Sequence, residues 1–202
     1  MAATTFDNTR GRHGAVAVLL HWVMALLLVG LSLLGLYMTT LPDAGFDKRK
    51  VFLVIYHKEF GMAALALVVV RLAWSATGVQ PALATNVPEW QNVAARFVHL
   101  CFYAFMFALP ITGWMMSSAA GIPVEVLGIY LPDIIPYNDT HFQQLIVIHR
   151  WLGYALIPFI VVHAGAALHH HFVKRDDTLR KMLPQEAASA GALHHEARGV
   201  QQ

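Results

Sequence analysis

Four long apolar stretches, separated by shorter segments rich in proline, glycine and charge, organise the sequence. They run over residues 15–38, 51–74, 97–117 and 145–172. A helix needs about 20 predominantly apolar residues to cross a bilayer, and each stretch reaches that length. Backbone groups inside hydrocarbon must bond within their own segment, so each stretch is predicted to be a helix. The pattern predicts an all-α integral membrane protein, folded as a four-helix bundle.

The segments outside these stretches set the boundaries of one membrane domain, residues 15–173. Residues 1–14 form an N-terminal tail and residues 174–202 a basic tail, which we expect to be partly disordered after about Gln185. The first apolar stretch is too long for the core of a cleaved signal peptide, so we expect it to remain as a span. The connection 119–144 mixes apolar residues with glycines and prolines, which predicts that it lies along the membrane surface.

Composition supports a membrane protein and narrows its chemistry. The chain of 202 residues is 57% hydrophobic and 13% charged, with a mean hydropathy of +0.52. Soluble domains are typically about 45–50% apolar and about 25% charged. A formal net charge of +2 argues against a nucleic-acid partner. The single cysteine, Cys101, excludes internal disulfides and covalent haem attachment, so any haem would be held non-covalently, as haem b is.

The distribution of basic residues predicts how the chain crosses the membrane. If both termini are cytoplasmic, that side holds nine lysines and arginines: Arg10, Arg12, Arg71, Arg96, Lys174, Arg175, Arg180, Lys181 and Arg198. The opposite side then holds five: Lys48, Arg49, Lys50, Lys58 and Arg150. Cytoplasmic loops are enriched in these residues. We therefore expect a multi-pass membrane protein with both termini in the cytoplasm.

Three consecutive cations, Lys48, Arg49 and Lys50, do not follow the enrichment of basic residues on the cytoplasmic side, because this orientation places them outside. Two interpretations stay open. The cluster either anchors the second helix at the lipid interface or attracts an anion to the outer face. Lys58, immediately after His57, would add to an anion entrance.

Two histidines, His149 and His163, stand fourteen residues apart in the last apolar stretch. Fourteen residues make almost four helical turns, so both lie on one face, about 21 Å apart. Hydrocarbon offers an imidazole no polar partner, so each needs one from the protein or a cofactor. By depth, His21 matches His163 in the inner half of the membrane, and His57 matches His149 in the outer half.

Each depth-matched pair suits a haem iron. A six-coordinate haem iron takes two neutral imidazoles, and bundle interiors are where such sites are built. The alternative for any single histidine is a packing residue bonded to a neighbouring serine or threonine. Two matched pairs together favour two b haems, one near each membrane surface.

The fourteen-residue interval recurs in the other spans. It joins His21 to Gly35, His57 to Arg71, and His99 to Gly113. A glycine at this distance leaves room for a porphyrin edge, and an arginine can pair with haem propionates. Gly61 and Gly153, four residues after His57 and His149, either admit the macrocycle or serve ordinary helix packing.

Two further histidines are candidate cofactor contacts near the inner surface. His99, three residues after Arg96, could bond a propionate or a quinone oxygen, or be a plain interfacial histidine. His170 follows His163 by seven residues and so lies nearly on its face. A zinc or nickel site in the run 169–171 is poorly supported, because no carboxylate or cysteine ligands accompany it.

These motifs resemble the bacterial cytochrome b561 family of four-helix, di-haem membrane cytochromes, and within it the branch that includes superoxide oxidase. The similarity rests on LLHWVMALL around His21, on Tyr56-His57-Lys58, and on HLCFYAFMFALPITGWMM in the third span. It rests most on the fourth span, HRWLGYALIPFIVVHAGAALHHHFVKRDDTLRKMLP. Together the motifs cover roughly residues 14–184.

The resemblance implies that His21 and His163 ligate an inner haem and that His57 and His149 ligate an outer one. It also implies electron exchange with membrane quinone. In the superoxide-oxidising members an electron passes from superoxide to ubiquinone, which would make the chain an oxidoreductase.

The chain departs from that pattern mainly in its third connection. Glu125, Asp133 and Asp139 bring negative charge there, with no lysine or arginine. This weakens the case for an anionic substrate. It supports an alternative, an electron-transfer subunit that serves a separate periplasmic redox protein through an acidic docking surface. A third hypothesis, a haem-free histidine-rich protein that binds a metal ion, is disfavoured by the depth-matched pairs.

Overall fold

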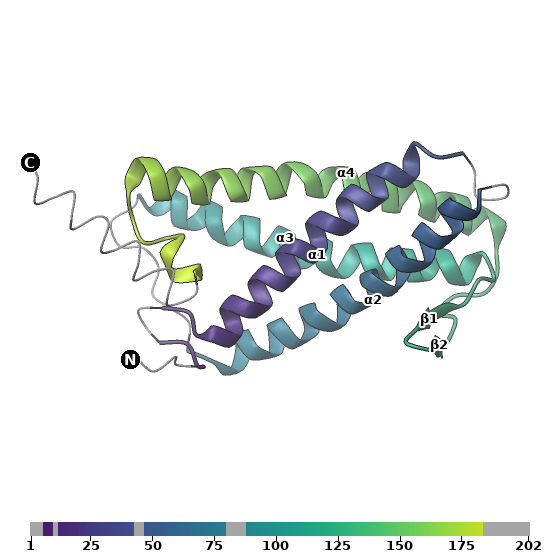
Figure 1. Ribbon diagram of the computed structural model, residues 1–202, viewed down its shortest axis with the longest axis horizontal. Helices are drawn as coiled ribbons and strands as arrows, with labels where there is room; N and C mark the ends of the chain where they lie inside the picture. Colours follow the sequence, from purple (N-terminus) through teal and green to yellow (C-terminus); the bar gives the residue numbers. More distant parts are fainter. Residues whose placement is uncertain (1–5, 10–11, 43–46, 80–87, 184–202) are drawn as a thin grey trace, which may run out of the picture.

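The computed structural model describes residues 6–9, 12–42, 47–79 and 88–183. Four long helices run along its long axis in alternating directions, as Figure 1 shows. They are α1 (Ala15–Thr39), α2 (Lys48–Thr77), α3 (Glu89–Ala119) and α4 (Asp139–His169). All four are long and apolar enough to span a membrane. The prediction of an all-α membrane bundle with four spans is confirmed.

Two helices extend well beyond their apolar stretches. α3 begins at Glu89 and α4 at Asp139, because helical hydrogen bonding continues into the interface, where polar side chains reach water. Asp47 caps α2 by accepting a hydrogen bond from the backbone of Arg49 at 2.8 Å, and Asn138 caps α4 in the same way. The apolar stretches therefore located the four spans but not the residues at which the helices begin and end.

The bundle core lies between three helices. Met24 of α1, Val68 of α2 and Met106 of α3 are buried together, with Phe102 and Leu65 among the residues packed against them. α1 and α4 touch each other least of the four neighbouring helix pairs. Large apolar side chains cover the outside of the bundle, as expected for surfaces that face lipid rather than water.

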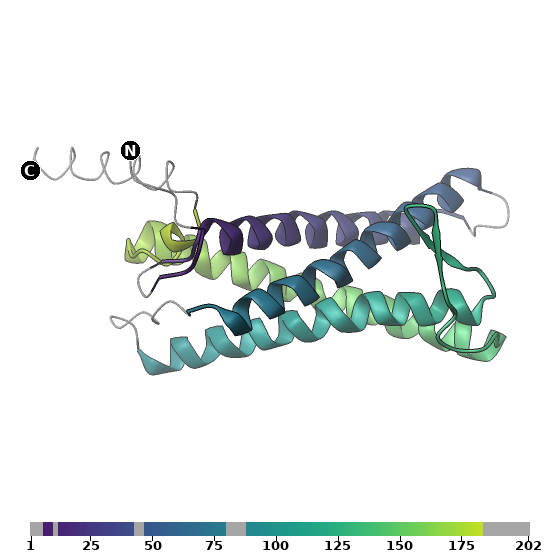
Figure 2. The ribbon, with the colours of Figure 1, turned by 90° about the horizontal axis from the view of Figure 1, so that it is seen from below.

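The connection between α3 and α4 contains a small hairpin. Strands β1 (Val124–Val126) and β2 (Ile129–Leu131) pair antiparallel around Leu127 and Gly128, which both have positive φ (51° and 81°), as a two-residue type I′ turn requires. Figure 2 shows the hairpin reaching from the end of α3 across to α2. Sequence patterning did not predict it, because a leucine precedes the glycine where asparagine or aspartate usually marks such a turn.

Side chains tie this connection to the bundle. The indole nitrogen of Trp114 donates to the carbonyl oxygen of Pro132 at 3.1 Å, and the Ser118 hydroxyl accepts from the backbone of Ile134. The ammonium of Lys58 donates to the carbonyl oxygen of Pro123, also at 3.1 Å. The hairpin is therefore fixed at the end of the bundle opposite the start of α1 (Figure 1).

Beyond α4 the chain folds back on the start of α1. A π-helical turn (His170–Lys174) ends at Arg175 in left-handed conformation, and a short 3-10 turn follows (Arg180–Met182). The indole nitrogen of Trp22 donates to the carbonyl oxygen of Met182 at 2.6 Å, and Arg12 donates to that of Leu183 at 2.7 Å. The predicted disorder after Gln185 lies outside the described residues.

Candidate haem sites

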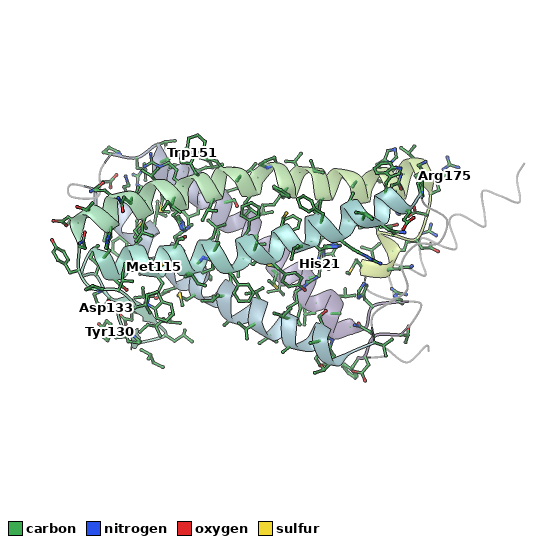
Figure 3. The ribbon with its side chains drawn as sticks, turned by 180° about the vertical axis from the view of Figure 1, so that it is seen from behind. His21, Met115, Tyr130, Asp133, Trp151 and Arg175 are labelled. Atoms are coloured by element: carbon green, nitrogen blue, oxygen red, sulfur yellow. The ribbon has the colours of Figure 1, made fainter. Side chains whose placement is uncertain are left out.

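The inner histidine pair joins the first helix to the last. The ring centres of His21 on α1 and His163 on α4 are 6.2 Å apart. His99 of α3 stands beside them, with its ring centre 5.5 Å from that of His163, and the ring of Phe102 packs at 5.2 Å from the same imidazole. In Figure 3, His21 lies in the half of the bundle that ends at Arg175.

Positive charge gathers around this inner pair. Arg71, near the end of α2, lies within electrostatic range of His21, His99 and His163. Burial lowers the pKa of His13, just ahead of α1, and the positive charge of Arg71 lowers it further. Arg71, fourteen residues after His57, thus lies near the inner pair, and its pairing with haem propionates stays a prediction.

The outer pair joins α2 to α4. The ring centres of His57 and His149 are 6.1 Å apart, at the hairpin end of the bundle. A Cβ added at Gly35 would lie 3.6 Å from Cε1 of His57, and one at Gly113 would lie 3.4 Å from Cε1 of His149. A side chain at either position would therefore be in van der Waals contact with an imidazole of this pair.

The ring-centre distances of both pairs are compatible with a shared metal. An imidazole nitrogen binds a transition metal at about 2.0–2.1 Å and lies about 1 Å from its own ring centre, so two imidazoles that shared one metal would have centres roughly 6 Å apart. Among the described residues no group of three or more histidine, cysteine or carboxylate side chains could hold a metal ion. A two-histidine site suits haem, because the porphyrin supplies the remaining ligands.

Two further observations fit a planar cofactor at the outer pair. The Nδ1 atom of His57 is buried and bonds to no group among the described residues, and a buried polar atom without a partner is costly. A Cβ added at Gly61 or Gly153 would meet no atom within 4 Å. The residues at the outer pair therefore fit a haem, with His57 and His149 as the ligands and the glycines beside its ring.

The outer cations surround the beginning of α2. Lys48 and Arg49 are exposed in the first turn of the helix, and the ammonium of Lys50 donates to the carbonyl oxygen of Leu41 at 3.1 Å. Lys58, next to His57 in sequence, bonds to the hairpin. Both amines thus lie at the hairpin end of the bundle, where the His57 and His149 pair also lies.

The spacing of His170 from His163 suggested a cofactor contact, but the side chain of His170 lies against Asp176. Its Nδ1 atom lies 2.5 Å from a carboxylate oxygen of Asp176, in the turn after α4. Burial alone would raise the pKa of Asp176, but hydrogen bonds from His170 and Thr178 outweigh that effect and hold the pKa below its usual value. A cofactor contact for His170 stays a prediction.

Sequence reasoning missed two sets of residues around the histidines. Phe102 and Phe105 of α3 pack edge-on against Phe159 of α4, with ring centres 6.5 and 5.3 Å away, between the two histidine levels of α4. Thr112 of α3 contacts His149. Phenylalanine and threonine are ordinary packing residues in membrane helices, so no sequence signal marked them.

Comparison with known proteins agrees with this geometry. The model of the prokaryotic cytochrome b561 family matches residues 12–185. Cytochrome b561 homolog 2 of Escherichia coli K12 is 30% identical over 190 residues, which cover 93% of this chain and 99% of that protein. Cytochrome b561 homolog 1 of the same organism is 28% identical, over 86% of this chain and 98% of the relative.

A third relative carries a more specific name. The probable superoxide oxidase CybB of Yersinia pestis is 24% identical over 177 residues, which cover 87% of this chain and 97% of that protein. The family match spans the four helices and both histidine pairs, and family membership implies b-type haem and membrane electron transfer. The chain belongs to the prokaryotic cytochrome b561 family.

Proposed function

We propose that this membrane cytochrome holds two b haems and transfers electrons between superoxide at its outer face and ubiquinone in the membrane. The observation that carries the proposal is the pair of facing imidazoles at each of two levels, with α4 contributing one histidine to each level. Bound haem would supply reversible one-electron transfer at both levels. His149 and His163, about 21 Å apart along α4, would put one such centre near each membrane surface.

The residues between the two levels exclude water. Phe102, Phe105 and Phe159 lie there, beside the buried core of Met24, Val68 and Met106. An apolar interior holds no group that could trap a proton or an ion between the two centres. This arrangement supports electron transfer across the bundle rather than transport of an ion through it.

The outer cations support an anionic substrate. Superoxide carries one negative charge and loses one electron to become dioxygen, so its oxidation requires a positive approach rather than an acid or a base. Lys48, Arg49, Lys50 and Lys58 supply that charge at the end of the bundle where the outer pair lies. The name of the 24% identical relative from Yersinia pestis supports the same substrate.

The inner end supports the quinone side of the reaction. Ubiquinone takes up two electrons and two protons to become ubiquinol, so two superoxide ions are oxidised for each quinone reduced. Arg71 and His99 lie beside the inner pair and are candidates for holding haem propionates or a quinone oxygen. The count of basic residues favours both termini, and hence this end, on the cytoplasmic side of the inner membrane.

The deciding experiment is an optical spectrum of the purified protein during exposure to superoxide. We expect rapid appearance of the reduced b-haem bands, followed by their reoxidation when a ubiquinone analogue is added. The control is the same protein with superoxide dismutase present, which should abolish the reduction. A protein with both haems that superoxide does not reduce would refute the proposed substrate.

A second function is favoured by the acidic connection between α3 and α4. Glu125, Asp133 and Asp139 are all exposed at the outer end, and no lysine or arginine lies in residues 119–144. This surface would suit a basic periplasmic redox protein, with the chain as its quinone-linked electron-transfer subunit. Fast reduction of the haems by ubiquinol, with no reaction with superoxide, would favour this function.

A further inference from the structure

Thr112 contacts the outer histidine pair from α3. Its hydroxyl oxygen lies 3.1 Å from Nδ1 of His149 on the neighbouring helix α4. The same oxygen lies 2.7 Å from the carbonyl oxygen of Ala108 and 2.9 Å from that of Leu109, one turn back on its own helix. The hydroxyl therefore has three polar neighbours but a single hydrogen to donate.

The direction of the bond to His149 follows from this geometry. The carbonyl oxygens of Ala108 and Leu109 can only accept, and both lie closer to the hydroxyl than the imidazole does, which favours donation of the Thr112 hydrogen to them. Towards His149 the hydroxyl then accepts, from a hydrogen on Nδ1 of the imidazole. The carbonyl oxygen of Leu109 is a second acceptor near the same ring. In a neutral imidazole the other nitrogen, Nε2, is then unprotonated and free to bind iron.

The backbone around Thr112 holds this contact in place. Gly113, the next residue, lets α3 approach the imidazole, because a Cβ there would stand 3.4 Å from Cε1 and 3.7 Å from Nδ1 of His149. Pro110, two residues earlier, has no N–H to donate in the helix. His57, the other member of the pair, has no such acceptor for Nδ1 among the described residues. The two imidazoles of the outer pair are therefore held differently.

We propose that Thr112 is a positioning residue for the outer haem, holding His149 in the tautomer that presents Nε2 to the iron. The proposal rests on the proposed function, because it needs a haem at His57 and His149. A ligand histidine that donates its second N–H to an acceptor is a stronger electron donor through the metal-bound nitrogen. That donation stabilises the oxidised iron, so Thr112 would keep the reduction potential of the outer haem lower than it would otherwise be.

The test compares three variants of the purified haem-loaded protein. Thr112→Val keeps a branched side chain but removes the acceptor, and Thr112→Ser restores the hydroxyl without the methyl group. Thr77→Val is the matched control, because the Thr77 hydroxyl bonds back to Ala73 and Trp74 in the same way without touching a histidine. Haem content, a potentiometric titration that resolves the two haems, and the low-spin electron paramagnetic resonance signals are measured for each.

We expect Thr112→Val to raise the potential of the outer haem and shift its resonance signal, and to weaken its binding on the order of 10- to 100-fold, the usual cost of losing such a partner. Thr112→Ser and Thr77→Val should retain the outer-haem potential of the parent, and the inner haem should be unchanged in all three. If Thr112→Val loses the outer haem altogether, Thr112→Ser becomes the deciding variant. Retention of the outer haem at the parent potential in Thr112→Ser supports the role of the hydroxyl. Loss of that haem, or a changed potential, overturns it.

Other outcomes separate this inference from the function on which it rests. A parent protein with no haem at the outer pair overturns both. A parent with two haems and an outer potential that Thr112→Val leaves unchanged overturns the role of Thr112 alone. An equal shift in Thr77→Val would also overturn it, because the effect would then come from losing a helix back-bond.

Discussion

At the residue scale, sequence spacing predicted which of the four histidines lie side by side, and their role as haem ligands stays a prediction. The interval of fourteen residues placed His149 and His163 on one face, and depth matched each to its partner. The same interval brought Gly35 and Gly113 to the outer imidazoles, and Arg71 to the inner ones. The intervals are local to each helix, so helical geometry gives the depth of each residue, whereas the contacts between helices also depend on how the helices pack.

The first prediction separates the two haems. Replacing His149 with alanine should remove the outer haem and spare the inner one, because His57 is left without a facing ligand; His163→Ala should do the reverse. A pyridine haemochrome assay should show about one haem lost from each variant. The control is His141→Ala, which removes an exposed imidazole from the start of the same helix. Loss of both haems from a folded variant would show that the pairing is wrong.

The second prediction concerns Arg71. Its positive charge near His21 and His163 favours the reduced, less positive iron, so Arg71→Gln should lower the potential of the inner haem. The electrostatic effect should be on the order of 1 kcal/mol, the scale of a partly screened unit charge. Arg150→Gln, an exposed arginine beside His149, is the control and should leave the inner haem unaffected. An unchanged inner potential in a fully haem-loaded Arg71→Gln protein would contradict this role.

The contact of Thr112 shows what spacing along one helix cannot reveal. It depends on the rotation of α3 relative to α4 and on the direction of one hydroxyl hydrogen. Neither is encoded in a periodic pattern. The three phenylalanines between the histidine levels escaped notice for a related reason, since which helix faces they share depends on packing between α3 and α4.

At the scale of elements, hydropathy located all four helices but predicted neither where each helix ends nor the hairpin between α3 and α4. α3 begins eight residues before its apolar stretch, at Glu89, because a helix continues wherever its backbone can bond and its polar side chains can reach water. The hairpin could not be predicted because its turn uses Leu127 in a left-handed conformation. Its position depends on bonds from Trp114 and Lys58, which are distant in sequence.

The turn after α4 yields the third prediction. Hydrogen bonds in the folded protein hold the pKa of the Asp176 carboxyl below its ordinary value of about 3.9. The ionised carboxylate therefore stabilises the turn fully above about pH 3.9. This stabilisation is lost as the pH falls through the lowered pKa. The contact should therefore persist at neutral pH and fail only in strong acid. Asp176→Asn should weaken it at neutral pH by about 1–2 kcal/mol, since it removes a charge-assisted bond to His170.

Hydrogen exchange provides the measurement. The backbone N–H of Thr178, which donates to Asp176 at 2.9 Å, should exchange faster in Asp176→Asn than in the parent at pH 7. Asp177→Asn is the control, because Asp177 is exposed and pairs only with Arg180, at 3.4 Å, among the side-chain contacts resolved for it. Equal exchange at Thr178 in the parent and Asp176→Asn would show that the carboxylate does not hold this turn.

At the scale of the whole molecule, the charged side chains and the two histidine pairs are arranged along one axis. Figure 3 shows His21 in the half of the bundle that ends at Arg175, with Tyr130 and Asp133 at the opposite end. The outer cations and the acidic side chains of the connection between α3 and α4 share that opposite end. In the two proposed functions, the net electrostatic potential at that end would determine whether it attracts superoxide, an anion, or a basic protein.

The fourth prediction tests that field. If Lys48, Arg49 and Lys50 steer superoxide, the rate of haem reduction by superoxide should fall as salt rises, because charges are screened over about 8–10 Å at physiological ionic strength. Changing all three to glutamine should lower the rate at low salt, by roughly tenfold or more, and flatten the salt dependence. Stopped-flow spectroscopy measures both.

The control for the fourth prediction changes charge at the other end. Lys174→Gln with Arg175→Gln removes two exposed cations from the turn after α4 and should leave the salt dependence as it is in the parent. Both haems must be retained in every variant. A fast reaction that is independent of salt, and unaffected by the three outer changes, would rule out electrostatic steering by this cluster.

The placement of α4 has a consequence for biosynthesis. In the proposed pairing α4 contributes one ligand to each haem, and it is the last of the four spans to leave the ribosome. Until it is inserted, His21 and His57 lack the facing imidazoles that α4 supplies. In the proposed pairing, neither site would be complete during synthesis of the first three helices. Haem loading would then follow insertion of the final span.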